Sequence, residues 1–546
     1  MSSGSNQNLH IILYQIAVGE IPGDFLPLRV QVLRYWLRSV ALRDPMRKSP
    51  VFIVVCLTCL CSSQIAAPPK PSIAADLEAA IDQIRAAPLR GDLSFLASDL
   101  LEGRDTPSRG LDIAAEYIAA QFRSAGLEAG GDDGYYQSAR MAVSESNQEG
   151  LELKFSRPKG GFTGNPKDVE IDSTAGLDVS GAPLFKLDVN DSSLLEGLTA
   201  EQVKGKVVVI ELARGGGANT RSALAKLREA KPAAIVIIDR RAAGDEQQPG
   251  KRLIDPEMPS ARTPRIRLAG QDAARFYSAL KAGATDAVAS IHVAAPRQTP
   301  ATLHNVIGIL RGSDPALKNT CVLLTAHYDH LGRLADGPGD RIYNGANDDG
   351  SGTVSVIEVA RALASLRPHP RRSIVFMTFF GEEEGLVGSR YYARHPAWPL
   401  DKTIAQLNLE QVGRTDSSEG PQISNATLTG FDYSDLSGYL SKAGELTGIK
   451  LYKHPHNSDP YFRQSDNLSL AEAGVPAHTL AVSFEFPDYH GLGDEWQKID
   501  YDNMAKVDRM IAVALVMVAN ADEPVHWNEK NSKAAAFVKA WKERHP

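Results

Sequence analysis

The pattern of apolar and polar positions alternates regularly in the second half of the chain. From residue 305 onward, short apolar runs bounded by polar residues predict strands buried on both faces. These runs cover residues 305–310, 321–326, 373–380, 404–409 and 477–482. Helical spacing appears between several of them, including residues 354–366, and again at 501–520 after the last run. Apolar strands alternating with helices predict an α/β fold with a mostly parallel central sheet flanked by helices.

The chain before this sheet begins with helical patterns. Residues 73–87 place Leu77, Ile81 and Ile84 on one face, and residues 93–104 contain a second short helix that ends at Gly103. Residues 110–126 form an amphipathic pattern that stops at a glycine. We expect these helices to open the domain that the later strands complete.

Residues 145–297 have a different character. Strands are predicted at 205–212, 233–239, 264–268 and 289–294, with a helix at 220–230, but the segment presents no cluster of His, Asp and Glu. Strands and helices without a site predict a smaller inserted domain, α/β or β-rich, joined by Gly- and Pro-rich linkers near 157–161 and 296–300. The expected organisation is a first part of the main domain at 68–144, the insert at 145–297, the catalytic part at 298–525 and a C-terminal tail at 526–546.

The first 67 residues predict an export signal preceded by an extension. A basic start at Met46-Arg-Lys48 is followed by an apolar run at 51–60 and by small residues at 62–67. This is the three-part pattern of a secretory signal. We expect cleavage near Ala66 or Ala67, export to the periplasm or the extracellular space, and no membrane span afterwards. The alternative is a cytoplasmic stub, residues 1–45, before an uncleaved anchor.

Composition narrows the possible chemistry. The chain has 546 residues, 43% of them hydrophobic, which is enough for two folded domains. A net charge of −7 gives no reason to expect a nucleic-acid partner. Three of the four cysteines lie in or beside the apolar signal run, which leaves Cys321 alone. Any metal must therefore be held by His, Asp and Glu rather than by a thiolate cluster.

Candidate ligands follow the predicted strands. His327 follows one strand, Glu382 and Glu383 follow another, and Glu410 follows a third. In open α/β sheets the ligand crevice lies beyond the carboxyl ends of the strands, so these groups should meet at one edge. For single motifs the ordinary alternatives are a hydrogen-bonded surface pair at His327 and Asp329 and a solvated helix start at the acidic run.

Two further groups complete a metal site of nitrogen and oxygen ligands. Asp348 lies in a Gly-, Asn- and Asp-rich loop at 344–352, and His490 lies in a loop after the last strand. Such groups suit a pair of zinc or similar ions, with Asp348 best placed to bridge them. Asp329 can orient His327. Of the adjacent Glu382 and Glu383, one can bind metal while the other receives a proton.

Five motifs in order resemble the co-catalytic, two-zinc aminopeptidase family, which is related to glutamate carboxypeptidase and glutaminyl cyclase. They are Ala326-His-Tyr-Asp-His-Leu-Gly332, Gly345-Ala-Asn-Asp-Asp-Gly-Ser-Gly352, Gly381-Glu-Glu-Glu-Gly-Leu386, Asn408-Leu-Glu-Gln-Val-Gly-Arg414 and Asp488-Tyr-His490. Residues 95–104 also resemble the start of family members that carry a protease-associated (PA) insert, and residues 145–297 fit that insert.

The resemblance implies a role for each candidate residue. One ion would take His327, Asp348 and Glu410, and the other would take Asp348, Glu383 and His490. Glu382 would be the general base and Asp329 the orienting carboxylate, and a cis peptide would join Asp348 to Asp349. The chain departs from the family pattern in having Glu410 where Asp is usual and Asn467 where many members have His.

The function implied is that of a secreted aminopeptidase with two divalent ions, zinc by family, acting on peptides with a free N-terminus. One alternative is a single-zinc transferase similar to glutaminyl cyclase. The other is a non-catalytic binding protein on the same fold, because fold alone does not determine function. His304, His330 and His478 are expected to be scaffold or surface residues.

Overall fold

The computed structural model describes residues 72–545, apart from 212–217, 241–250, 259–262 and 336. These described residues belong to one compact unit. The predicted signal and its extension lie outside them. None of the helices in the described ranges has the length and apolar character needed to cross a membrane.

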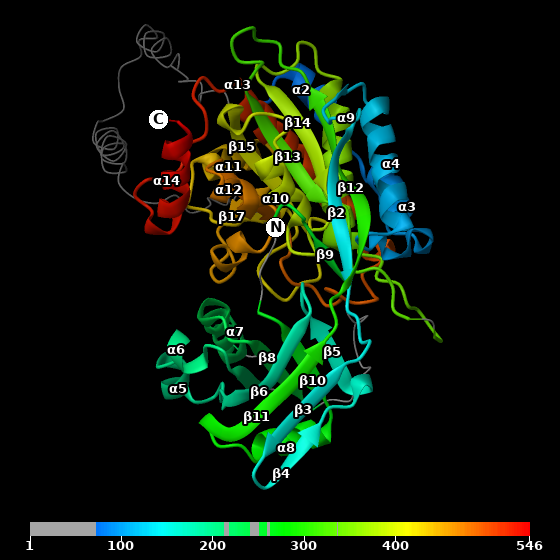
Figure 1. The fold of residues 1–546 in the computed structure, drawn as a ribbon. Helices are drawn as coiled ribbons and strands as arrows, with labels where there is room; N and C mark the ends of the chain where they lie inside the picture. The colour runs from blue at the N-terminus through cyan, green and yellow to red at the C-terminus, as the bar shows by residue number, and fades with distance from the viewer. Residues whose placement is uncertain (1–71, 212–217, 241–250, 259–262, 336, 546) are drawn as a thin grey trace, which may run out of the picture. The chain divides into compact units, whose positions relative to one another are not determined.

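A ten-stranded sheet forms the centre of the described part of the chain, and its middle strands are parallel (Figure 1). The parallel strands are β18 (Ala477–Ala481), β15 (Thr403–Leu409), β13 (Cys321–His327) and β14 (Ser373–Phe379). Antiparallel pairing continues the sheet on one side through β12 (Arg297–Leu310), β2 (Tyr136–Glu145) and β9 (Lys251–Ile254), with β1 (Glu128–Ala129) beside β12. The other edge holds β16 (Asn425–Leu428) and β17 (Lys450–Tyr452).

Helices bury both faces of this sheet. Alternating residues of β13 enter two separate apolar clusters: Val322 and Leu324 lie in one, Cys321 and Leu323 in the other. The larger cluster is completed by α2 (Ala75–Ile81), α3 (Ala86–Leu96), α4 (Arg109–Ser124), α9 (Gly352–Ala364), α11 (Leu436–Thr447) and α13 (Tyr501–Asn520). The smaller cluster is completed by α10 (Val387–Arg394), α12 (Asn467–Glu472) and α14 (Ala535–Arg544). The predicted α/β fold with a largely parallel, doubly covered sheet is confirmed.

A second sheet of eight strands is built within residues 152–293. Its order is β4 (Gly160–Thr163), β3 (Glu152–Arg157), β11 (Gly283–Val293), β6 (Leu177–Lys186), β7 (Val207–Glu211), β8 (Ala234–Asp239), β10 (Arg265–Ala269) and β5 (Val169–Asp172). Its helices are α5 (Ser192–Glu196), α6 (Ala200–Val203), α7 (Ala218–Ala230) and α8 (Gln271–Ser278). Successive β7 residues face different clusters, since Val207 and Val209 lie in one and Val208 and Ile210 in the other.

Several expected boundaries differ in the structure. The Gly- and Pro-rich stretch at 157–161 is the tight turn of the β3–β4 hairpin rather than a linker. Residues 297–300 of the second stretch lie within β12, where Pro300 pairs with Ala142 of β2. Among the described residues, no strand pairs with the other edge of β12 at this position. A proline is tolerated there because its missing N–H is not needed.

Two more differences concern the ends of the main domain. The helix expected at 73–87 ends at Ile81 as α2, and a second helix, α3, begins at Ala86 with Pro88 in its first turn, where proline is tolerated. Residues 526–546 are more than a tail, because α14 buries Phe537 beside Trp527 in the smaller cluster of the main domain.

Candidate metal centre

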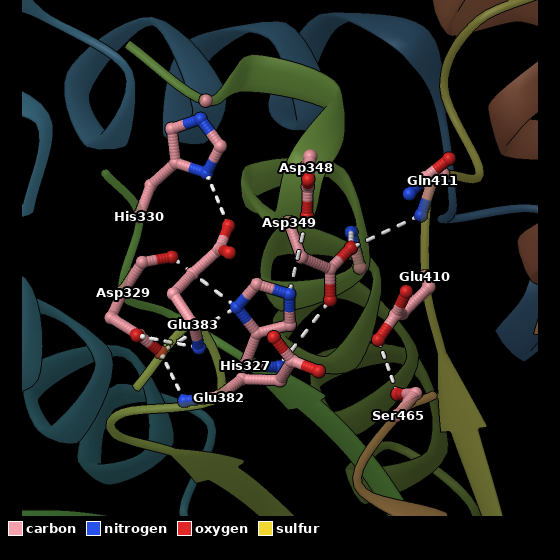
Figure 2. Close-up of polar contacts among 12 residues, drawn as sticks. His327, Asp329, His330, Asp348, Asp349, Glu382, Glu383, Glu410, Gln411 and Ser465 are labelled. Atoms are coloured by element: carbon pink, nitrogen blue, oxygen red, sulfur yellow. Dashed lines mark hydrogen bonds and ion pairs between the residues drawn. The ribbon is translucent and has the colours of Figure 1, made fainter. Parts of the chain in front are cut away.

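The candidate ligands meet at the carboxyl edge of the parallel strands. His327 is the last residue of β13, and it pairs in register with Phe379, the last residue of β14. Glu382 and Glu383 follow β14 within four residues, and Glu410 directly follows β15. The ends of neighbouring parallel strands therefore bring side chains from distant parts of the sequence together (Figure 2).

Asp348 lies at the centre of the group. Its Oδ1 is 3.3 Å from Nε2 of His327, and its Oδ2 is 3.0 Å from Nε2 of His490. His490 Nε2 is also 3.5 Å from Oε2 of Glu383. Each oxygen of one carboxylate thus faces a different imidazole.

His330 belongs to this group, although the sequence analysis assigned it to the scaffold. Its Nδ1 is 2.9 Å from Oε1 of Glu383, and the ring is buried (Figure 2). Single ligand atoms from His330, Asp348 and Glu383 all lie within 4.8 Å of one another. The signal for His330 was its position three residues after His327 in the same motif, but burial could not be deduced from that spacing.

Glu410 lies on the other side of His327 from Glu383. Its Oε1 accepts a hydrogen bond from the hydroxyl of Ser465 (Figure 2). Ser465 lies two residues before Asn467, the position where many members of the resembled family have His. The contact shows how the longer Glu410 side chain is held where the family pattern has Asp.

Asp329 contacts both the imidazole and the following glutamates. His327 Nδ1 is 3.5 Å from Oδ1 of Asp329 and 3.2 Å from its backbone carbonyl oxygen. The Asp329 carboxylate also accepts hydrogen bonds from the backbone N–H groups of Glu382 and Glu383. With Nδ1 occupied in this way, Nε2 of His327 is the nitrogen that faces Asp348.

Asp349 is not among the predicted ligands, yet it ties three segments together. Its carboxylate accepts hydrogen bonds from the backbone N–H groups of His327, Gln411 and Gly352. His327 ends β13 and Gln411 lies two residues after β15, so one carboxylate fixes two of the strand ends that carry candidate ligands. The peptide bond between Asp348 and Asp349 is cis, as predicted.

Charge in the site is arranged to bind cations. Burial raises the pKa of Glu382 well above its ordinary value and the pKa of Glu410 to about 8. Although burial opposes it, hydrogen bonds from the His327 and His490 imidazoles lower the pKa of Asp348. Against the effect of burial, Asp348 and Glu383 raise the pKa of His490 to about 10. Crowded carboxylates that stabilise protons on imidazoles would stabilise a divalent cation that displaces those protons.

The donor set fits zinc or a similar ion. Imidazole nitrogens and carboxylate oxygens converge without thiolates, and the one cysteine among the described residues, Cys321, is buried at the opposite end of β13. In the described part of the chain, neither ring nitrogen of His330 nor Oε1 of Glu383 has a hydrogen bond of normal geometry. Buried polar atoms that lack a hydrogen bond of normal geometry are expected where they bind a ligand such as a metal ion.

A cavity of about 440 Å³ opens beside the group. Its lining includes Asp105, Lys251, His330, Tyr343, Glu383 and His490. Lys251 begins β9, so the segment predicted as an insert contributes a strand to the main sheet and a side chain to the cavity. None of the ion pairs described above involves a residue of that segment.

Comparison with known proteins finds relatives of the region that contains this centre. Residues 305–515 match the profile of peptidase family M28. A probable zinc metalloprotease of Pyrenophora teres f. teres is 34% identical over 264 residues, which are 41% of this chain and 53% of the relative. Aminopeptidase YwaD of Bacillus subtilis is 27% identical over 256 residues, 44% of this chain and 50% of the relative. The chain spans about half the length of the curated relatives it matches.

A solved structure supports the fold. The aminopeptidase from Aneurinibacillus sp. strain AM-1 aligns over 83% of this chain and 100% of its own, with a TM-score of 0.54 and 20% identity. At that identity the likeness concerns the fold alone. Residues 305–515, which contain His327, Asp348, Glu383, Glu410 and His490, thus resemble peptidase family M28 over less than half of the chain.

Proposed function

We propose that this protein is an aminopeptidase that hydrolyses N-terminal residues from peptides at a site for two divalent ions, zinc by its donor set. The observation that carries the proposal is Asp348. Its two carboxylate oxygens lie 3.3 and 3.0 Å from the Nε2 atoms of His327 and His490, two different imidazoles. A carboxylate placed between two ligand sets is what a pair of ions about 3.5–4 Å apart requires.

Each ion would have its own residues beside the shared one. His327 and Glu410 would complete one site with Asp348, and Glu383 and His490 would complete the other. When bound, such ions polarise the scissile carbonyl and lower the pKa of water. His330 would hold Glu383 in place through the contact between its Nδ1 and Oε1 of Glu383.

Glu382 is the proposed general base. Its backbone is held by Asp329, and its side chain is not needed by the ligand sets described above. Burial raises the pKa of this carboxyl well above its ordinary value, so it holds a proton more readily than an exposed glutamate does. Glu382 would take a proton from the attacking water and return it to the leaving amine.

The substrate class follows from the cavity and from the relatives. The cavity of about 440 Å³ suits one end of a peptide rather than a long segment. Asp105 on its wall supplies a carboxylate that can attract a free ammonium group. One of the similar proteins, YwaD of Bacillus subtilis, is named as an aminopeptidase.

Metal analysis and a substrate panel test the proposal together. The protein is purified, and its metal is counted by elemental analysis before and after chelation and re-addition of Zn²⁺. We expect two ions per chain and hydrolysis of aminoacyl substrates, with N-acetylated versions untouched. One ion with cyclisation of N-terminal glutamine would favour the transferase alternative. Bound metal without turnover of any substrate would favour the binding protein.

We also propose that the mature enzyme is exported, from the pattern between Met46 and Ala67. Expression from Met46 in a bacterial host, followed by N-terminal sequencing of the exported product, tests this. The expected N-terminus lies just after Ala66 or Ala67. A product that keeps the apolar run at 51–60 would refute cleavage.

A further inference from the structure

Arg104 is a fully buried cation that binds main-chain oxygens only. It is 1% exposed. Its guanidinium donates to the carbonyl oxygens of Tyr328 at 2.8 Å, Asn344 at 2.8 Å and Gly345 at 2.8 Å, and also to Leu96. Tyr328 follows the ligand His327, and Asn344 and Gly345 begin the loop that carries Asp348. One side chain thus joins two ligand-bearing segments.

The backbone around Arg104 is built to deliver this side chain. Arg104 has φ of +51°, a left-handed conformation that is uncommon for a residue with a side chain. Its carbonyl oxygen accepts from the backbone N–H of His330, and Gly103 accepts from Gly332. A Cβ on Gly103 would lie 2.2 Å from the carbonyl oxygen of Gly332, so only glycine permits this approach. An unusual conformation kept in place by neighbours is a sign of a constrained role.

Asp494 holds the same loop from the opposite end. Its carboxylate accepts hydrogen bonds from the backbone N–H groups of Asn347 and Asp348, each at 3.0 Å, and its carbonyl oxygen accepts from Ala346. Asp494 is fully buried and lies four residues after His490. Within the described residues, neither Arg104 nor Asp494 forms an ion pair. Both charges are bonded to backbone groups of the loop at 344–348, and Arg104 also to the carbonyl oxygens of Tyr328 and Leu96.

We propose that Arg104 and Asp494 are positioning residues that act as a clamp of opposite charges on the loop of Asp348, and that this clamp sets the affinity of both metal ions. Arg104 binds the carbonyl groups where the loop enters, and Asp494 binds the N–H groups where it leaves. Because Asp348 is the residue shared by both ions, a loosened clamp should weaken both together. The inference rests on the proposed two-ion site.

Electrostatics alone predicts that the removal of Arg104 changes the metal affinity in the opposite direction. The four carboxylates that act on its charge are Asp329, Asp494, Asp348 and Asp349. Removing a positive charge from this neighbourhood should by itself strengthen the binding of a divalent cation. If Arg104 instead positions the loop, its removal should weaken metal binding even though the site becomes more negative. The direction of the change therefore separates positioning from simple charge.

The experiment titrates metal-free protein with Zn²⁺ by calorimetry and with Co²⁺ by visible absorption. The first variant, Arg104→Met, removes the positive charge. The second, Arg104→Lys, keeps the charge but lacks the several N–H donors of the guanidinium group. The third is Asp494→Asn. The matched control is Arg372→Lys, because Arg372 is also buried and donates to the carbonyl oxygens of Ala521 and Asp522 far from the site. Thermal unfolding confirms that each variant is folded.

Supporting partners of metal ligands usually contribute 10–100-fold to metal affinity. We expect a loss of about that size for both ions in Arg104→Met, Arg104→Lys and Asp494→Asn, an altered Co²⁺ spectrum, and neither change in Arg372→Lys. Unchanged or tighter binding in folded Arg104→Met would overturn the clamp. So would weakening of one ion only. Should wild-type protein bind a single ion, the two-ion proposal fails, but the clamp is still tested by that ion's affinity.

Discussion

The carboxylate of Asp329 accepts a hydrogen bond from the backbone N–H of Glu382 at 3.1 Å, and a second from Glu383 at 3.3 Å. The same carboxylate lies 3.5 Å from Nδ1 of His327. One side chain therefore connects a candidate ligand at the end of β13 with the proposed base and a candidate ligand after β14. From the sequence, only the contact of Asp329 with His327 is expected.

Replacing Asp329 by Asn should disturb both connections. The amide keeps one acceptor but turns an NH₂ group toward a backbone N–H or the imidazole, which leaves donors facing donors. We expect turnover and metal affinity to fall roughly 10–100-fold, as for other partners of metal ligands. Steady-state kinetics and metal titration measure the two effects. Asp314→Asn is the matched control, since Asp314 also accepts from backbone N–H groups but lies away from the site. Wild-type behaviour of Asp329→Asn would exclude both roles.

The fold was largely predictable because its central strands and long helices have strong periodicity. The helix expected at 501–520 is α13, Tyr501–Asn520, and the run at 321–326 is β13, Cys321–His327. Short edge strands such as β16 and β17 were missed. Their residues become strands by pairing with β18 and with each other, which leaves no local pattern.

The site was predictable where ligands stand at strand ends, and less so elsewhere. The motifs predict that His327, Asp348 and Glu383 lie together, because metal binding requires imidazole and carboxylate side chains, and the structure has them close to one another. Arg104 and Asp494 bind backbone atoms of a remote loop, so no spacing in the sequence connects them to it. Their role depends on tertiary packing.

His330 and His490 should differ in their effect on metal binding. His490 faces both Asp348 and Glu383, whereas His330 faces Glu383. We expect His490→Asn to lose one ion. His330→Asn should keep two ions and weaken the second by roughly 10–100-fold. Metal counting and calorimetric titration of both variants measure this. If His330→Asn loses an ion and His490→Asn does not, the two histidines have exchanged roles.

Lys251 tests how the segment at 145–297 shapes substrate access. Deleting that segment would also remove β9 from the main sheet, so a point variant is the cleaner change. Lys251 lines the cavity, where its ammonium can attract a substrate carboxylate. Lys251→Ala should raise KM for acidic peptides roughly two- to five-fold, the size of an exposed ion pair, and leave metal content at the wild-type value. Lys159→Ala, in the β3–β4 turn, is the control. Equal changes for acidic and neutral peptides would contradict the prediction.

Asp508 should make the fold less stable as pH rises. It is buried in α13, and burial raises the pKa of its carboxyl from 3.8 to about 7. Between these values the folded protein binds more protons than the unfolded chain, so stability decreases from about pH 4 to pH 7. Asp508→Asn removes this dependence and should stabilise the metal-free protein above pH 7 by at most roughly 4 kcal/mol.

Denaturant unfolding of metal-free protein at several pH values measures the effect of Asp508→Asn. The exposed Asp502 on the same helix supplies the control, Asp502→Asn, which should leave the pH dependence unchanged. A stability difference between wild type and Asp508→Asn that stays constant from pH 4 to pH 8 would show that Asp508 does not titrate in this range.

Glu382 and Glu383 are adjacent in sequence, yet their surroundings assign them different roles. Oε1 of Glu383 is 2.9 Å from His330 and Oε2 is 3.5 Å from His490, so Glu383 lies among the other candidate ligands. Glu382 is the proposed base. Glu382→Gln keeps size and hydrogen bonding but cannot accept a proton, so turnover should fall roughly 10²–10⁴-fold with two ions still bound. Glu383→Gln should lose an ion, because a neutral amide is a poor substitute for an anionic ligand. Turnover and metal content are measured for both variants together. If Glu382→Gln loses an ion while Glu383→Gln keeps both, the two roles are reversed and the motif is aligned one residue out of register.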